Sequence, residues 1–367
     1  MARLSLTQTA LPLFKAVIDR KVSIPVLQYV LVTVRDGESF GTATNFDRYV
    51  SMPVDAGTAP GLYKVIGKEL VLTKEPPAGF PIVPTWYSEP FLTVPIGILK
   101  ASLPFINKEE SRYTLNALLI RVPVSGPIVV SATDGHRLRV QHLVNPGGLP
   151  IGDYLVPRAT VEVLCRHAKG NVFFKFNPED EQTRLRIVTS TFGMYSRTLT
   201  GHYPNYAAVL PNKLPFQIAV LKNDLDAAIK AIIPFVNEEG RGHGVQLDFS
   251  PADVLILGTI KEQAFQKAVS VTSLPLESPA GFDGSRYLSN PDHAVSVIMP
   301  MRVTGTSQNM IGINILYLQD VVNGIDSDTV FIAWKDGQSS VTVTGHNLME
   351  GSVAVPDFFD VEFDVVA

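Results

Sequence analysis

The chain has 367 residues, 46% of them hydrophobic and 18% charged, which is the composition of a globular protein with sizeable cores. Its formal net charge of −4 is uneven, with +1 over residues 1–92, +6 over 93–213 and −11 over 214–367, which excludes a generally basic nucleic-acid binder. Cys165 is the only cysteine, so an intramolecular disulfide and a cysteine-based metal site are excluded; with neither a secretory pattern nor an apolar run near ~20 residues, we expect a cytoplasmic protein without membrane contact.

Three segments have apolar residues three or four apart, followed by apolar–polar alternation. They are residues 9–34, 95–122 and 221–249. The first spacing is typical of a helix and the second of a strand, so each segment is predicted to be a helix followed by a strand.

A second pattern also occurs three times, at residues 63–72, 154–165 and 311–322. Each reads as a short strand that runs into a helix. Valine-rich strands are expected to follow, as in "NVFFKF" and "TVFIAW". The proline-containing stretches 79–84 and 202–211 then indicate domain boundaries.

A short motif marks the same place in each repeat. "GTATNFDR" (41–48) and "VSATDGHR" (130–137) share Ala-Thr-[Asn/Asp]-x-x-Arg, and "LILGTIKEQ" (255–263) is a weaker copy. The repeat favours a strand–turn–strand corner, with Asp134-Gly135 as its turn. The alternative is an enzyme that uses Asp134 and His136, but partner residues with a recognisable spacing are missing. We therefore expect no catalytic residue, no metal ligand and no cofactor.

The chain thus reads as three copies of one unit, each made of two helix-plus-sheet halves. The expected domains are residues 1–92, 93–213 and 214–367. The first is shortened, because little room for strands lies between Lys74 and Phe80. The third is expected to contain an insertion at about 275–308 and an extended C-terminal tail.

Several motifs resemble a known family. "SRYTLNALL", "VVSATDGHRL" and "YPNYAAVLP" closely resemble the middle domain of the bacterial sliding clamp, the β subunit of DNA polymerase III. "SIPVLQYVLV" and "INILYLQDVVNGI" resemble its first and third domains. The resemblance implies an α+β fold of three similar DNA-clamp domains, each with two helices packed on antiparallel sheets. It also implies a head-to-tail dimer that closes into a ring.

The function implied by this resemblance is that of a processivity factor without a catalytic site of its own. The ring would encircle double-stranded DNA without reading sequence. It would bind the replicative DNA polymerase catalytic subunit, the clamp loader and repair proteins through short peptide motifs. The main alternative is a clamp-like monomeric decoy or regulator that binds such peptides without encircling DNA, an idea motivated by the shortened first domain.

A clamp should offer scattered basic residues to phosphates. The segments expected to form inner helices supply Lys15, Lys21, Lys68, Lys100, Lys108, Arg158, Arg166, Lys222 and Lys230. The resemblance favours Lys21, Lys68 and Lys108 as DNA contacts, and we include Lys100, Arg158 and Lys222. The alternative for each is an ordinary solvated side chain.

The resemblance also implies a peptide-binding pocket between the second and third domains. Its residues would be Leu115, Thr133, Gly135, His136, Arg137, Leu138, Pro204, Val209, Asn314, Tyr317, Ser340 and Val353. Leu138 and Val209 would form an apolar floor, or else fill the core, while His136 and Arg137 would orient the peptide.

This sequence departs from the family pattern at three places. Ala208 stands where the family usually has a basic residue. In place of the family's short Met-Pro-Met-Arg-Leu ending this chain has "SVAVPDFF", and "DVEFDVVA" runs beyond it. Phe358, Phe359 and Phe363 of the tail "DFFDVEFDVVA" could compete for the pocket. A near-copy of that ending, "VIMPMRV", lies instead at 297–303 and is either a chance match or a part of the pocket.

Overall fold

The computed structural model describes most of the chain up to residue 345. The described residues are 3–4, 10–18, 24–73, 79–81, 91–177, 184–211, 213–236, 243–249, 253–257, 260–261, 264–265, 268–274, 282–283, 294–301 and 310–345. Lys21, Val353 and the expected tail lie outside them. Within these segments, none of the helices is long and apolar enough to span a membrane.

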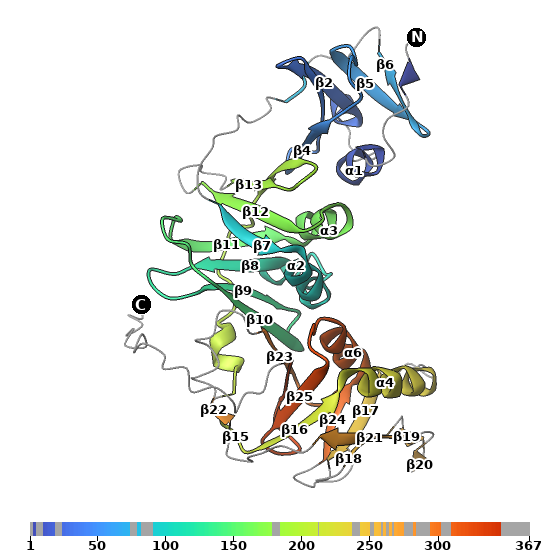
Figure 1. The fold of residues 1–367 in the computed structure, drawn as a ribbon, viewed down its shortest axis with the longest axis vertical. Helices are drawn as coiled ribbons and strands as arrows, with labels where there is room; N and C mark the ends of the chain where they lie inside the picture. Colours follow the sequence, from blue (N-terminus) through green and yellow to red (C-terminus); the bar gives the residue numbers. More distant parts are fainter. Residues whose placement is uncertain are drawn as a thin grey trace. The chain divides into compact units, whose positions relative to one another are not determined.

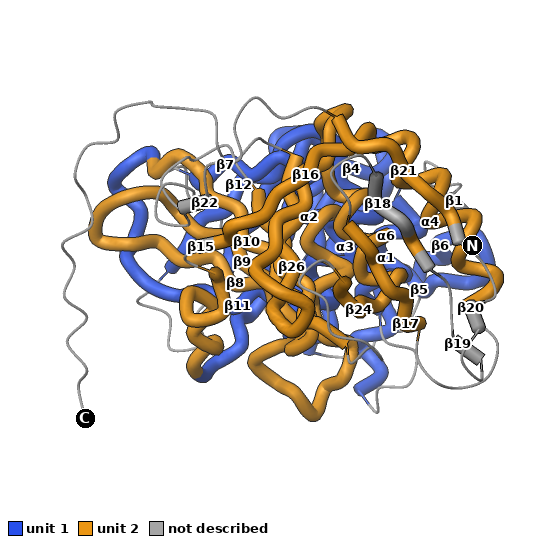
Figure 2. Tube along the Cα trace, turned by 90° about the horizontal axis from the view of Figure 1, so that it is seen from below, with its two compact units in different colours: residues 1–99, 146–201 blue, residues 100–145, 202–367 orange. Residues whose placement is uncertain are grey.

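The chain divides into two compact units, which are coloured separately in Figure 2. Unit 1 comprises Met1–Leu99 and Pro146–Gly201, and unit 2 comprises Lys100–Asn145 and His202–Ala367. The expected middle domain therefore contributes to both units. The boundaries expected near residues 92 and 213 remain predictions.

Unit 1 is built on one antiparallel sheet with the strand order β1-β6-β5-β2-β3-β4-β14-β13-β12-β7 (Figure 1). Helix α1 (Ala10–Val17) packs on β3 and β4, and α3 (Arg158–His167) follows β11 (Gly152–Pro157). The sheet strands are β1 (Arg3–Leu4), β2 (Tyr29–Arg35), β3 (Glu38–Thr44), β4 (Arg48–Pro53), β5 (Gly61–Ile66), β6 (Glu69–Leu72), β7 (Leu92–Pro95), β12 (Asn171–Phe176), β13 (Arg184–Val188) and β14 (Gly193–Arg197).

The core of unit 1 lies between its helices and the sheet. Helix α1 buries Leu13, Phe14 and Val17 on one face, as its apolar spacing predicts. On the side of α3, the hydroxyl groups of Thr160 and Ser196 lie 2.6 Å apart in a buried hydrogen bond between the helix and β14.

Unit 2 has a second antiparallel sheet, in which its strands run in the order β8-β9-β10-β23-β26-β25-β16-β21-β18-β17-β24. The strands are β8 (Ala117–Val122), β9 (Ile128–Thr133), β10 (Arg137–Leu143), β16 (Phe216–Leu221), β17 (Gly244–Phe249), β18 (Asp253–Leu257), β21 (Ala268–Leu274), β23 (Ala294–Ile298), β24 (Met310–Asn314), β25 (Thr329–Trp334) and β26 (Val341–Thr344). The short strands β15 (Lys213–Leu214) and β22 (Phe282–Asp283) pair with each other, as do β19 (Ile260–Lys261) and β20 (Ala264–Phe265).

The helices of unit 2 lie next to each other in the structure. Helix α4 (Lys222–Val236) contacts α6 (Ile315–Asn323), and both bury one apolar face. Helix α2 (Ile96–Ser102) spans the sequence boundary between the two units. Unit 2 also contains three short 3₁₀ helices, η2 (Leu103–Phe105), η3 (Tyr113–Leu115) and η4 (Tyr206–Val209).

Most of the expected helix–strand units are confirmed. Helices α1, α2 and α4 are followed by β2, β8 and β17, and β11 and β24 run directly into α3 and α6. "NVFFKF" and "TVFIAW" are the strands β12 and β25. The fold is therefore α+β, with few helices on extensive antiparallel sheets, as expected.

The helix expected within residues 63–72 is wrong. The segment forms the β5–β6 hairpin, in which Ile66 pairs with Glu69 across a two-residue turn. Gly67 has φ +61°, a left-handed conformation that glycine adopts readily and that closes such turns. The left-handed conformation of Gly67 closes a hairpin here, although the spacing of the apolar residues predicts a helix.

The stretch 275–308 contributes a strand to the main sheet of unit 2. Strand β23 lies between β10 and β26 and pairs antiparallel with both. It therefore connects the hairpin of the middle part of the chain with the last strands of the third part. The length of the third repeat predicts this stretch only as an insertion.

Candidate functional site

The β9–β10 hairpin turns at residues 133–137, which we call the 133–137 corner. Gly135 has φ +91° there. The Thr133 hydroxyl accepts from the Gly135 amide at 3.1 Å and donates to the Arg137 carbonyl at 2.7 Å. Asp134 Oδ1 accepts from the amides of His136 and Arg137, at 2.9 and 3.1 Å. These side-chain-to-backbone bonds confirm a strand–turn–strand corner.

Residues 44–48 repeat this geometry in unit 1. The Phe46 amide donates to Thr44 Oγ1 at 3.0 Å, and the Arg48 amide donates to Asn45 Oδ1 at 2.9 Å. Phe46 takes the place of Gly135 and is also left-handed, with φ +71°. The sequence repeat is therefore a structural repeat, which explains why similar residues recur without shared chemistry.

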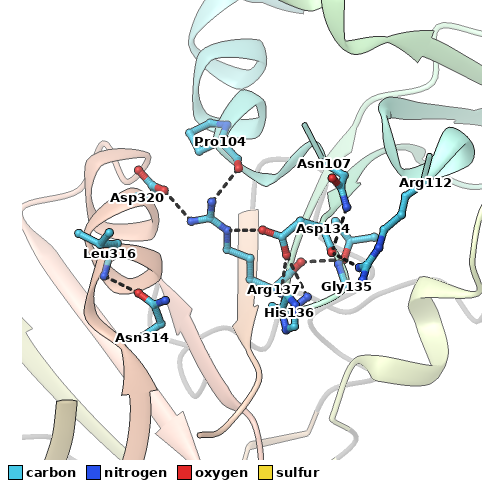
Figure 3. A network of polar contacts seen from close by, with 11 residues as sticks. Pro104, Asn107, Arg112, Asp134, Gly135, His136, Arg137, Asn314, Leu316 and Asp320 are labelled. Carbon is cyan, nitrogen blue, oxygen red and sulfur yellow. Dashed lines mark hydrogen bonds and ion pairs between the residues drawn. The ribbon is translucent and has the colours of Figure 1, made fainter. Parts of the chain in front are cut away.

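Arg137 is the centre of a polar network that joins β10, η2 and α6 (Figure 3). Its Nε donates to Asp134 Oδ2 at 3.1 Å, its Nη1 to Asp320 Oδ2 at 2.6 Å and its Nη2 to the Pro104 carbonyl at 2.7 Å. The residue is only 7% exposed. Charge-assisted bonds of this kind are roughly twice as strong as neutral ones, so the network fastens the corner to α6.

Two aromatic rings, those of Phe105 and Tyr317, lie next to the Arg137 guanidinium. The Arg137 guanidinium carbon is 4.3 Å from the centroid of the Tyr317 ring and 4.9 Å from that of Phe105. The His136 ring stacks on Tyr317 with centroids 6.3 Å apart. Burial, followed by the negative charge of Asp134, raises the pKa of Tyr317 above its usual value, so its phenol is neutral at pH 7.

The segment after β23 reaches the same corner. The Met299 amide donates to the His136 carbonyl at 2.9 Å, and the Met299 side chain is 42% exposed. Met301 then bridges to Gly312 of β24 through a 2.7 Å bond from its amide to the Gly312 carbonyl. The described part of the "VIMPMRV" segment, residues 297–301, therefore lies beside His136, and its flexible apolar Met299 side chain is available for contact.

Six residues of the expected pocket come together at this corner. Leu138 is 3% exposed and pairs across the sheet with Thr133 and Val297. Tyr317 contacts both His136 and Arg137. The six are Thr133, Gly135, His136, Arg137, Leu138 and Tyr317.

The other expected pocket residues occupy separate elements. Asn314 caps α6, because its Oδ1 accepts from the Leu316 amide at 2.9 Å (Figure 3). Leu115 belongs to η3, Ser340 immediately precedes β26, and Val209 is 43% exposed at the end of η4. Pro204 is exposed shortly before η4, which also contains Ala208.

Three residues of the site were missed by sequence reasoning: Pro104, Phe105 and Asp320. Asp320 had a usable signal, because it is the only acidic residue between 311 and 322 and a buried arginine needs a carboxylate partner. Phe105 and the Pro104 carbonyl had no signal, since their approach to Arg137 depends on the path of the chain between α2 and β8.

The expected DNA-contacting residues fall into two groups. In the first, the basic groups already have protein partners: Lys15 Nζ donates to the Gly67 carbonyl at 2.6 Å, Arg158 Nε donates to Glu162 Oε1 at 2.8 Å, Lys222 donates to the Ile325 carbonyl and Lys230 pairs with Asp226. The second group is exposed and comprises Lys68, Lys100, Lys108 and Arg166. Lys68 and Lys108 are not on helices as expected, since Lys68 lies in the β5–β6 turn and Lys108 lies in the loop after η2.

Both oxygens of the Asp134 carboxylate accept hydrogen bonds within the 133–137 corner. One oxygen binds two backbone amides and the other binds Arg137. Among the described residues, His, Cys, Asp and Glu side chains do not gather in a group of three or more that could hold a metal ion. The arrangement is that of a hydrogen-bonded corner packed against aromatic rings.

Comparison with known proteins gives a consistent result. No family model matches the chain. It is 27% identical to the beta sliding clamp of Salmonella typhimurium over 279 residues, 74% of this chain and 66% of that protein. It is 26% identical to the beta sliding clamp of Chlamydia muridarum over 176 residues, 47% of each. The matches thus span about half to two thirds of these relatives.

Solved structures show a similar fold over a larger part of the chain. The DNA polymerase III subunit beta sliding clamp of Pseudomonas aeruginosa bound to griselimycin has a TM-score of 0.65 at 20% identity, covering 93% of this chain and 97% of that one. The beta subunit of Streptococcus pyogenes DNA polymerase has a TM-score of 0.67 at 15% identity and covers 91% and 95%. The chain is thus similar in sequence to bacterial beta sliding clamps and shares the fold of the β subunits of DNA polymerase III.

Proposed function

We propose that this protein is a DNA sliding clamp, a ring dimer that encircles duplex DNA and tethers a replicative polymerase to it. The observation that carries the proposal is the fold match to polymerase III β clamps over more than nine-tenths of both chains. Tethering raises the effective concentration of the polymerase at the primer end without any new catalytic group. The protein acts in the cytoplasm, has no enzymatic activity and uses no cofactor or metal.

Contact with DNA is electrostatic and independent of sequence in this proposal. The exposed basic side chains Lys68, Lys100, Lys108 and Arg166 approach phosphates, together with Lys21, which lies outside the described residues. Lys222 and Arg158 contribute less, because their cationic groups are already bonded within the protein. A small number of dispersed contacts suits a ring that must slide.

Partners dock at the surface around the 133–137 corner, which we call the docking surface; it includes His136, Tyr317 and Met299. The support is the stacked His136–Tyr317 pair beside an exposed methionine, a setting suited to aliphatic and aromatic peptide anchors. The Pseudomonas clamp that binds griselimycin has the same fold. Polymerase, clamp loader and repair proteins are the expected partners.

Retention on DNA of different topology tests the clamp function. The protein is loaded with its clamp loader and ATP on a nicked circular plasmid, and the bound fraction is measured by gel filtration before and after linearisation. A ring stays on the circle and slides off the ends of the linear form. Equal retention on both forms would mean simple affinity for DNA and would contradict encirclement.

A further inference from the structure

We infer that Arg137 is a positioning residue: it holds α6 against the 133–137 corner and thereby builds the docking surface without touching the docked partner. The inference rests on the proposed peptide docking and assigns Arg137 a different task from orienting the peptide. The residues that would meet a partner are its neighbours His136, Tyr317 and Met299.

The first argument is that each guanidinium nitrogen already has a partner. Nε, Nη1 and Nη2 bind the Asp134 carboxylate, the Asp320 carboxylate and the Pro104 carbonyl, respectively, at 3.1, 2.6 and 2.7 Å (Figure 3). A docked ligand would have to displace one of these bonds from a residue that is only 7% exposed. Removing a charged partner from a buried group is costly, so a ligand binds more favourably to the less buried neighbours of Arg137.

The second argument is the way Arg137 sets the Tyr317 ring. The guanidinium lies 4.3 Å from the Tyr317 centroid, and the His136 ring stacks on the same tyrosine. The planar guanidinium can stack and form several hydrogen bonds at once, which a lysine ammonium cannot do. Tyr317 and Asp320 both belong to α6. Arg137 therefore holds the helix by two contacts, a cation–π contact with the Tyr317 ring and an ion pair with the Asp320 carboxylate.

The third argument comes from the structural repeat. Arg48 occupies the place of Arg137 in the 44–48 corner of unit 1. Burial lowers the pKa of Arg48, while the charges of Asp47 and of Glu162 on α3 act in the opposite direction. The arginine of the first corner thus also lies close to the acidic group of a following helix, although no docking was predicted there. The two corners thus share an arginine that interacts electrostatically with a carboxylate on a helix, Glu162 on α3 for Arg48 and Asp320 on α6 for Arg137.

Two variants separate positioning from direct contact. Arg137→Lys keeps the charge but loses the stacking and the forked bonds, and Asp320→Asn removes only the ion pair. We expect the Kd for griselimycin, measured by calorimetry, to rise about tenfold or more in each variant, the weakening typical of losing a charge-assisted bond. The double variant should bind no more weakly than Arg137→Lys, because Asp320 acts only through Arg137.

Arg112→Lys is the matched control. Arg112 is an exposed arginine that also binds the corner, through its 3.3 Å bond to the Asp134 carbonyl, but it does not reach α6. Its replacement should leave the Kd within about twofold. Hydrogen exchange of the α6 amides, measured without ligand, should become faster in Arg137→Lys and Asp320→Asn and stay unchanged in Arg112→Lys.

The outcomes decide clearly. A raised Kd in Arg137→Lys together with an unchanged Kd in Asp320→Asn would mean that Arg137 touches the ligand. That result would overturn the inference. A loss of stability with an unchanged Kd in both variants would do the same. If the unaltered protein fails to bind griselimycin, the proposed docking is at fault; the α6 exchange rates still test the fastening, and rates equal to the unaltered protein would refute it.

Discussion

At the scale of single residues, Leu138 shows how burial limits a binding role. Its side chain is 3% exposed between Thr133 and Val297, so it belongs to the core beneath the docking surface. Leu138→Ala should lower the free energy of unfolding by about 2–5 kcal/mol, because a cavity is left in a packed sheet. Urea unfolding measures this loss. Val144→Ala, at a 68% exposed position, is the control and should change stability by less than about 0.5 kcal/mol. A loss below 1 kcal/mol at Leu138 would speak against its burial.

His142 on β10 makes stability depend on pH. It is 3% exposed, and burial lowers its pKa to about 4. The unfolded chain takes up the proton near pH 6.5, before the folded protein does, so stability is complete above that pH and is lost as the pH falls from about 6.5 to 4. The loss attributable to His142 should reach about 3 kcal/mol.

Unfolding curves between pH 7 and 4 test this dependence. His142→Leu should flatten the pH dependence of the unfolding free energy relative to the unaltered protein. His202→Gln, at an exposed histidine, should not. Identical slopes for His142→Leu and the unaltered protein would show that His142 titrates normally.

At the scale of elements, two glycines should respond to alanine with opposite signs. A Cβ at Gly41 of β3 would lie 2.7 Å from Cζ of Phe14 and 3.0 Å from a Val54 methyl carbon. Phe14 is fully buried on α1, so Gly41→Ala should push the helix from the sheet and cost about 1–3 kcal/mol. Gly97 of α2 is exposed with open space around it, and Gly97→Ala should add about 0.5–1 kcal/mol. Thermal melting of both variants checks the pair, and equal shifts would refute the close packing of α1 on β3.

At the scale of the whole molecule, a ring requires two chains. In the proposed ring, the charge of −11 on residues 214–367 and of +1 on residues 1–92 would give the head-to-tail contact a weak electrostatic attraction. Exposed ion pairs add only about 0–1 kcal/mol each, so apolar packing must supply most of the interface. Sedimentation at micromolar concentration should therefore give a dimer at both low and moderate salt. A monomer under both conditions would favour the decoy alternative instead.

The salt dependence of DNA binding tests which basic residues meet phosphates. Replacing Lys68, Lys100 and Lys108 together by Gln should lower the slope of log K against log salt concentration by about 0.9 for each lost contact, without changing sequence preference. Lys335→Gln, at an exposed lysine beyond β25, should leave the slope unchanged. An unaltered slope in the triple variant would show that these lysines are merely solvated.

The sequence by itself determined what depends on neighbouring residues. The 133–137 corner was predictable because its hydrogen bonds join residues at most four apart, and the periodic helices and strands followed from their own spacing. The family resemblance indicated the fold class and grouped His136 with Tyr317, whose rings stack in the structure. The hairpin at 63–72 was missed because one left-handed glycine overrode the apolar spacing.

Only the tertiary structure decided the contacts that close over long distances in the chain. Arg137 and Asp320 are 183 residues apart, and nothing local makes one require the other. Strand β23 takes its place between β10 and β26 through backbone pairing, which carries almost no sequence signature. For the same reason, Arg137 looked like a ligand contact in the sequence, while its burial among Asp134, Asp320 and Pro104 points to fastening the site.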